Sequence, residues 1–214
     1  DNVEGSIQVD SLSFKTKPNE FFIDKFLVVA SGHSLDRNLT ISSDIINGEI
    51  NGAYSFETII PSLMNTFKGY LPALINATQK KKLTKENNFS LLLTLEYTED
   101  ISKTLKLPFT IVNQARIVGH YNNRYNKFRV EAFLPGFRIG GSSFESGYLV
   151  CDNPTEDVSI HVKATNFNAK GLRNYIDFTA NAKDDKINSL LSLANNKSRV
   201  FKADISSSAH FVMQ

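Results

Sequence analysis

Apolar and polar residues alternate with a period of two over most of the chain after residue 40. Between residues 46 and 56, one parity carries Ile46, Gly48, Ile50, Gly52, Tyr54 and Phe56, and the other carries Asn47, Glu49, Asn51, Ala53 and Ser55. The stretch 89–97 repeats this pattern with Phe89, Leu91, Leu93, Leu95 and Tyr97. Because successive side chains of a strand point to opposite faces, the pattern predicts a β-sheet with one apolar face.

The same reasoning predicts a series of short strands along the chain. We expect strands over 3–14, 20–31, 38–46, 46–56, 88–97, 109–121, 127–134, 137–150, 157–166, 172–183, 186–194, 198–205 and 207–213. The segment 20–31 is apolar on both parities, so we expect it to be more deeply buried. Short links rich in Asn and Asp favour antiparallel neighbours. The sequence therefore predicts a mainly β fold, an antiparallel meander in a single domain over 1–214.

Helical spacing appears in one long segment. Apolar residues recur at steps of three and four from Ile59 to Ile75. Thr58 is a plausible N-cap, and Pro61 then falls in the first turn, where a missing N–H is harmless. Gly69 and Pro72 predict a break, so we expect a helix over about 58–69 with a kink or restart to about 78. It should lie on the sheet and cover apolar surface.

A second, shorter helix is indicated near residue 100. Thr98, Glu99 and Asp100 form a typical cap and acidic first turn. Pro108 cannot continue a helix, so we expect this one to cover about 99–106.

Composition and charge restrict the classes of function that fit this chain. The 214 residues include 16 Phe and 7 Tyr, and the net charge is +2. These values favour a folded core and give no broad electrostatic basis for binding nucleic acid. The single cysteine, Cys151, excludes an internal disulfide and is expected to be a small apolar strand residue. Because the first residues already look like a strand, we expect the chain to be a fragment of a longer protein.

Sequence motifs for catalysis or metal binding are missing. The histidines His33, His120, His161 and His210 lack partners at metal-ligand spacing. The glycine-rich segment 136–141 lies between strands, which favours a turn or bulge over a phosphate-binding loop. We therefore expect no enzyme activity, no metal and no cofactor. The run Lys80–Lys82 with Lys85 is typical of a solvated helix end, with contact to a membrane surface as the alternative.

The apolar parity is the main candidate site. Polar side chains should occupy the opposite face: Arg129, Glu131, Ser159, His161, Asp177, Ser192, Lys202 and Asp204. The apolar side could pack in a two-sheet sandwich, close into a barrel, or curl into an open groove for an apolar ligand. The pattern alone favours the sandwich.

Several phrases of the sequence resemble a known family. They are NLTISSDIINGEINGAYSFETIIPSL, LPALINATQKKK, NNFSLLLTLEYTEDISKTLKLP, VEAFLPGFRIGGSSFESGYLVCDNP and FTANAKDDKINSLLSLANNK. Together they resemble TamB-like translocation and assembly module proteins of Gram-negative bacteria, particularly those of the Bacteroides group. The resemblance extends over essentially the whole chain, although no short motif is diagnostic.

The resemblance implies a fold and a setting. Such proteins belong to the AsmA-like group of bridge-type lipid transporters, with a curled β-taco sheet and an apolar interior. They are anchored in the inner membrane by an N-terminal helix, cross the periplasm and work with an outer-membrane BamA-like barrel protein. This chain would then be a periplasmic segment, with membrane contact through parts of the protein absent here. The helix near 58–78 departs from an uninterrupted taco and would plug or line the groove.

Two functions follow as expectations. The first is a non-enzymatic groove that carries phospholipid acyl chains and supports outer-membrane biogenesis. The alternative is a filled β-sandwich scaffold that docks a BamA-like barrel or a nascent outer-membrane protein by strand-edge pairing. The expected groove residues are Ile46, Ile50, Tyr54, Phe56, Phe89, Leu91, Leu93, Leu95, Phe128, Val130, Leu134, Val158, Ile160, Val162, Ile176, Phe178, Leu191, Leu193, Phe201, Ile205 and Phe211.

Overall fold

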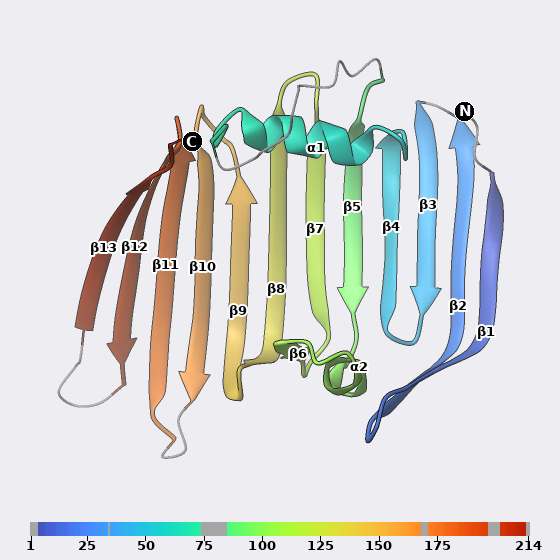
Figure 1. Cartoon of the computed structure of the whole chain (residues 1–214), viewed down its shortest axis with the longest axis horizontal. Coiled ribbons are helices and arrows are strands. Elements are labelled where there is room, and N and C mark those ends of the chain that lie inside the picture. Colours follow the sequence, from blue (N-terminus) through green and yellow to red (C-terminus); the bar gives the residue numbers. More distant parts are fainter. Residues whose placement is uncertain (1–3, 34, 74–84, 168–170, 197–201, 213–214) are drawn as a thin grey trace.

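Nearly all strands of the protein follow one another across a single antiparallel sheet (Figure 1). The computed structural model of the chain describes residues 4–33, 35–73, 85–167, 171–196 and 202–212. The first half contains β1 (Gly5–Lys15), β2 (Glu20–His33), β3 (Asp36–Ser43), β4 (Ile46–Ala53), α1 (Ile59–Lys68), β5 (Asn88–Leu95), α2 (Glu99–Thr104) and β6 (Phe109–Ile111). The second half contains β7 (Ala115–Asn122), β8 (Lys127–Ile139), β9 (Ser142–Asp152), β10 (Val158–Phe167), β11 (Arg173–Lys183), β12 (Lys186–Asn195) and β13 (Lys202–His210).

The sheet is an open meander. Its strand order is β1-β2-β3-β4-β5-β7-β8-β9-β10-β11-β12-β13, and the short β6 pairs with the far end of β8. The predicted fold class, mainly β and antiparallel, is therefore confirmed. The described strands form one sheet that is not closed into a barrel, so neither the two-sheet sandwich nor the barrel is the arrangement they adopt.

The two helices lie at opposite ends of the strands (Figure 1). Helix α1 crosses one end of the sheet, and the predicted helix over 58–69 is confirmed. The expected restart to residue 78 lies mostly outside the described residues. Helix α2 lies at the other end, where Thr16 Oγ1 and Asn19 Nδ2 of the β1–β2 turn donate to the carbonyls of Thr104 and Lys103, at 3.3 and 3.4 Å.

Neither predicted N-cap makes a side-chain capping bond. Thr58 and Thr98 do precede the helices, but their hydroxyls bind other groups. Thr58 Oγ1 accepts from Asn87 Nδ2 at 3.1 Å, and Thr98 Oγ1 accepts from the Ile111 N–H at 2.9 Å. Each threonine therefore joins a helix start to a distant segment.

Several predicted strand bounds need correction. The strands expected over 127–134 and 137–150 are β8 and β9, which turn at Gly140 and Gly141, where positive φ angles of 53° and 84° favour glycine. The segment 109–121 is divided into β6 and β7 because the Val112 and Asn113 N–H groups both donate to the Gly136 carbonyl. The two strands expected after residue 197 are, in the described part, the single strand β13.

Strand β2 is more exposed than predicted. Ile23 is its one buried residue, and the other positions are half-buried or exposed. The run of apolar residues on both parities indicated a central strand covered on both faces. Instead, β2 lies one strand from the edge of a single-layer sheet, so no second layer covers it.

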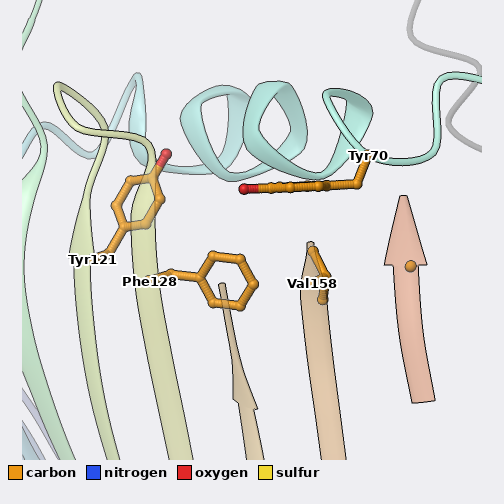
Figure 2. Packing of buried hydrophobic residues seen from close by; sticks show 5 residues of the cluster. Tyr70, Tyr121, Phe128 and Val158 are labelled. Atoms are coloured by element: carbon orange, nitrogen blue, oxygen red, sulfur yellow. The ribbon is translucent and has the colours of Figure 1, made fainter. Parts of the chain in front are cut away.

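The densest packing lies between α1 and the strand ends beneath it. Tyr70, Tyr121, Phe128, Val158 and Ala182 form a buried cluster, against which Leu63 and Phe67 of α1 pack. Figure 2 shows the hydroxyl of Tyr121 pointing toward the helix and the ring of Tyr70 lying beneath it. Tyr121 Oη is 2.8 Å from Ser62 Oγ and 3.0 Å from Thr66 Oγ1, and all three residues are buried. These contacts fix α1 to the apolar side of the sheet.

Candidate functional site: the apolar face

One row of side chains crosses the whole sheet without a polar residue. In an antiparallel sheet, residues directly opposite each other share a face, so the register of each strand pair can be followed from edge to edge. The central apolar row contains Ile7, Val28, Ile41, Gly48, Leu93, Ile117, Ala132, Leu149, Val162, Phe178, Leu191 and Ile205. At about 4.8 Å between strands, the row is about 53 Å long.

Two neighbouring rows extend this apolar face. On the side of α1 lie Leu39, Ile50, Leu91, Gly119, Val130, Cys151, Ile160 and Ala180. On the side of α2 lie Ile46, Leu95, Ala115, Leu134, Gly147, Ala164, Ile176, Leu193 and Ala203. The three rows together form the apolar face, with α1 along one side of it.

Helix α1 covers only the end of this face. The side chains beneath it belong to the last row of the strand ends, with Phe89, Tyr121, Phe128, Val158 and Ile187, and Cys151 and Ile160 of the next row pack against the same buried cluster. The central apolar row lies outside this cluster, and Leu93, Val162, Phe178 and Leu191 are half-buried. At the two sheet edges, Ile7 and Ile205 are 66% and 54% exposed. The apolar face is therefore covered by α1 at one end of the strands, and the described residues leave its central row uncovered.

The total surface area agrees with an uncovered face. The chain exposes 13,569 Å². A compact monomer of 23.9 kDa would expose about 9,900 Å². The excess in total accessible surface is about 3,700 Å². The large difference reflects a sheet with no second layer.

The register places most of the predicted groove residues on the apolar face. Leu93, Val162, Phe178, Leu191 and Ile205 are in the central apolar row. The neighbouring rows hold Ile50, Leu91, Val130, Ile160, Ile46, Leu95, Leu134, Ile176 and Leu193, and Phe89, Phe128 and Val158 lie in the row beneath α1.

Three predicted groove residues lie elsewhere, and a fourth is outside the described residues. Strand β4 ends at Ala53, so Tyr54 and Phe56 belong to the link before α1 rather than to the sheet. Tyr54 is buried against Phe89, with ring centres 6.1 Å apart, whereas Phe56 is 46% exposed. Phe211 follows β13 and donates its N–H to the Asp185 carbonyl, and Phe201 lies outside the described residues.

Among the described residues, the charged side chain of Arg37 lies on the apolar side of the sheet. Arg37 is opposite Gly52 in the row that continues beneath α1, and it is buried. Its guanidinium carbon lies 6.0 Å from the ring centre of Tyr54. Burial raises the pKa of the Tyr54 hydroxyl, and the positive charge of Arg37 partly opposes that shift. The arginine therefore borders the apolar rows and does not interrupt the central one.

The opposite face carries most of the charged groups, and they pair with one another. Arg129 Nε lies 2.6 Å from Glu131 Oε1, and the Arg129 guanidinium also forms an ion pair with Asp152. Arg129, followed by Tyr148, holds the pKa of the Glu131 carboxyl below its usual value. Farther along, Asp177 Oδ1 lies 2.7 Å from His161 Nε2. The polar residues predicted for this face occupy it, apart from Lys202, whose side chain is outside the description.

On the described part of the polar face, a serine and a histidine lie close together. His120 Nδ1 lies 3.0 Å from Ser90 Oγ in an open hollow of about 390 Å³. In the described part, no carboxylate is hydrogen-bonded to the other nitrogen of that ring, as a nucleophilic triad would require. Cys151 faces the apolar side, where burial and then the charge of Asp152 raise the pKa of its thiol, which lowers its reactivity.

Two buried asparagines at the α1 end were missed by sequence reasoning. Asn87 Oδ1 accepts from the Ser55 N–H at 3.0 Å, and Asn153 Oδ1 accepts from the Phe128 N–H at 2.8 Å. Both are essentially unexposed. Asn153 falls in one of the short Asn- and Asp-containing links between strands, and Asn87 directly precedes β5. No local signal marks such residues, because their partners come from sequence-distant segments.

Among residues 4–212, apart from those not described, no three His, Cys, Asp or Glu side chains gather as a metal site. None of the helices described there is long and apolar enough to span a bilayer. Comparison with protein-family models, curated proteins and solved structures gives no significant match.

Proposed function

We propose that this chain is a non-enzymatic lipid-binding segment whose apolar face carries phospholipid acyl chains. The observation that supports this proposal is the central apolar row, which crosses the sheet without a polar residue and without a covering layer. Each methylene group that is fully buried contributes about 0.8 kcal/mol, so a dozen methylenes contribute at most about 10 kcal/mol on a face that covers one side of the acyl chain. No specific contact is needed, and we expect weak selectivity among lipids.

The resemblance to TamB-like proteins suggests the setting. The chain would be a periplasmic part of a bridge from the inner to the outer membrane that supports outer-membrane biogenesis beside a BamA-like barrel. Acyl chains would lie on the rows between α1 and the α2 end of the strands. Because α1 occupies one end of the face, it would limit how far the chains extend in that direction.

Two adjacent leucines of β12 allow a matched test. Leu191 belongs to the central apolar row, whereas Leu190 points to the opposite face and is 42% exposed. We expect Leu191→Asp to reduce bound phospholipid strongly and Leu190→Asp to leave it unchanged. The measurement is mass spectrometry of lipid extracted from the purified chain after incubation with phospholipid. Phe178→Asp should behave like Leu191→Asp. Equal lipid in the two leucine variants, both shown to be folded by circular dichroism, would disprove the proposal.

A scaffold that binds by strand-edge pairing is the second candidate. It is favoured by the open edges of the sheet, since β1 and β13 each have one neighbour. An exposed edge offers unpaired N–H and C=O groups to another strand. Proline substitution at Ser206 in β13 should weaken such pairing, whereas Leu191→Asp should affect it only through stability. Loss of lipid with retained edge binding would separate the two functions.

A further inference from the structure

The ends of the strands opposite α1 carry a second concentration of exposed apolar side chains. Six large residues from three segments lie there, each between 40% and 49% exposed: Leu12, Phe14, Leu105, Leu107, Phe109 and Ile139. They form the lower-edge patch. Figure 1 shows the β1–β2 hairpin, α2 and β6 together at this end of the sheet.

Hydrogen bonds, an ion pair and strand pairing hold the three segments of the patch together. The β1–β2 turn donates two side-chain hydrogen bonds to the C-terminal carbonyls of α2. Glu99 of α2 pairs with Arg138 of β8 at 2.7 Å, and Phe109 lies opposite Ile139. The Gly140 N–H also donates to the Pro108 carbonyl at 3.2 Å. The patch therefore has a fixed shape and is not a set of independent loops.

Within the described part of the chain, two lysines without an ion-pair partner, Lys17 and Lys106, adjoin the apolar side chains of the lower-edge patch. The turn, α2 and the adjoining part of β8 carry five basic and three acidic side chains: Lys15, Lys17, Lys103, Lys106, Arg138, Glu20, Glu99 and Asp100. Glu20 is neutralised by Lys15 at 3.0 Å and Glu99 by Lys103 at 2.7 Å. Lys106 stands between Leu105 and Leu107, and Lys17 lies at the tip of the hairpin. Apolar side chains flanked by lysines match an anionic membrane surface.

We infer that the lower-edge patch docks this chain on the surface of an anionic phospholipid bilayer. Leu105, Leu107 and Phe14 would enter the boundary between head groups and acyl chains, while Lys17 and Lys106 contact lipid phosphates. This inference does not rest on lipid occupying the apolar face, because docking uses the strand ends alone. It differs from the expectation that membrane contact belongs only to parts of the protein outside this chain.

Vesicle flotation tests the inference directly. We expect the 214-residue chain to float with vesicles of phosphatidylglycerol and phosphatidylethanolamine, and much less with phosphatidylcholine alone. The double variant Leu105→Ser with Leu107→Ser should lose most of this binding. Lys17→Gln and Lys106→Gln should each reduce the partition coefficient about fivefold, and high salt should reproduce that loss.

A matched control comes from the other end of the molecule. Ile60 and Met64 of α1 are 64% and 43% exposed, so Ile60→Ser with Met64→Ser removes similar apolar surface. This control should keep vesicle binding. Equal binding by the chain, the patch variant and the control would overturn the inference, as would a loss in the control as large as in the patch variant.

Two further measurements test whether the lower-edge patch binds a bilayer. Sedimentation velocity distinguishes a bilayer from a second copy as the partner: a dimer that the Leu105→Ser, Leu107→Ser variant abolishes, with no vesicle binding by the parent, overturns the inference. Failure of the proposed function is recognised separately, because a chain without lipid on its apolar face would still float with anionic vesicles. Vesicle binding that is reduced in the patch variants but unchanged in Leu191→Asp supports docking independently of lipid on the apolar face.

Discussion

Asn153 offers a sharp test of how α1 is held over the sheet. Its Oδ1 accepts from the Phe128 N–H at 2.8 Å, and its Nδ2 donates to Tyr70 Oη at 2.6 Å and to the Asn126 carbonyl at 2.5 Å. The residue is 1% exposed. Asn153→Ala therefore removes three side-chain hydrogen bonds at a site where water does not readily replace them.

The size of the effect follows from the groups left behind. The Phe128 N–H becomes a buried donor without its acceptor, which costs about 1–3 kcal/mol. Tyr70 Oη keeps the contact from Asn126 Nδ2 at 3.3 Å, so its loss is smaller. Summing these terms, we expect the free energy of unfolding to fall by about 3 kcal/mol. For a chain of this length the midpoint of thermal unfolding should fall by about 6–12 °C.

Urea unfolding followed by circular dichroism measures this change, with Asn188→Ala as the control. Asn188 is an exposed asparagine on the opposite face of β12, so its truncation should change the free energy of unfolding by less than about 0.5 kcal/mol. If Asn153→Ala destabilised the chain no more than Asn188→Ala, the asparagine contacts would not be what fixes the α1 end, and the reasoning would be refuted.

Three other predictions concern single residues. An added Cβ at Gly48 would lie 2.4 Å from Leu93 Cδ2 and 2.7 Å from the Leu92 carbonyl oxygen, so Gly48→Ala should lower the free energy of unfolding by about 1–3 kcal/mol in urea titration. The raised pKa of the Cys151 thiol predicts slower reaction with a disulfide reagent near pH 8 than free cysteine shows; an equal rate would contradict the burial. Lys103 and then Arg138 hold the pKa of Glu99 below 4.5, so its stabilising effect is present above that pH and lost as the pH falls through the folded-state pKa. Glu99→Gln should accordingly lower the unfolding midpoint near pH 7, and the difference from the parent should shrink as the pH falls through the folded-state pKa; a pH-independent difference would argue against the pairing.

The sequence pattern was sufficient for the sheet and for its two faces. Alternation at a period of two assigns a face to each residue as long as a strand is regular, and Leu91, Leu93, Val162 and Phe178 lie where that rule puts them. It fails where strands end or irregularities intervene. Tyr54 continues the parity of β4 in sequence but follows the last strand residue, Ala53, so parity no longer determines its direction.

What the pattern could not supply was the number of layers. An apolar face has the same alternation whether it meets a second sheet, closes into a barrel or remains open. The three differ in contacts between sequence-distant residues, such as the pairing of Asn87 with Ser55 or of Asn153 with Tyr70. A single sequence carries no record of those contacts, which is also why sequence reasoning missed the two asparagines.

A sheet without a second layer has consequences for how its apolar face is maintained. Among the described strands, no second sheet packs against this one, so face-to-face packing does not hold the strands together. Backbone hydrogen bonds between neighbouring strands and side-chain contacts along the rows hold them together instead. Each strand of the meander contributes one residue to the central apolar row. A polar substitution in one strand therefore interrupts the row at that point and leaves the strand itself in place. Leu191→Asp should therefore leave the ladder between β11 and β12 in place while dividing the central apolar row. Stability and lipid binding become separable at this position, which is what allows the open face to be tested as a binding surface in a chain that remains folded.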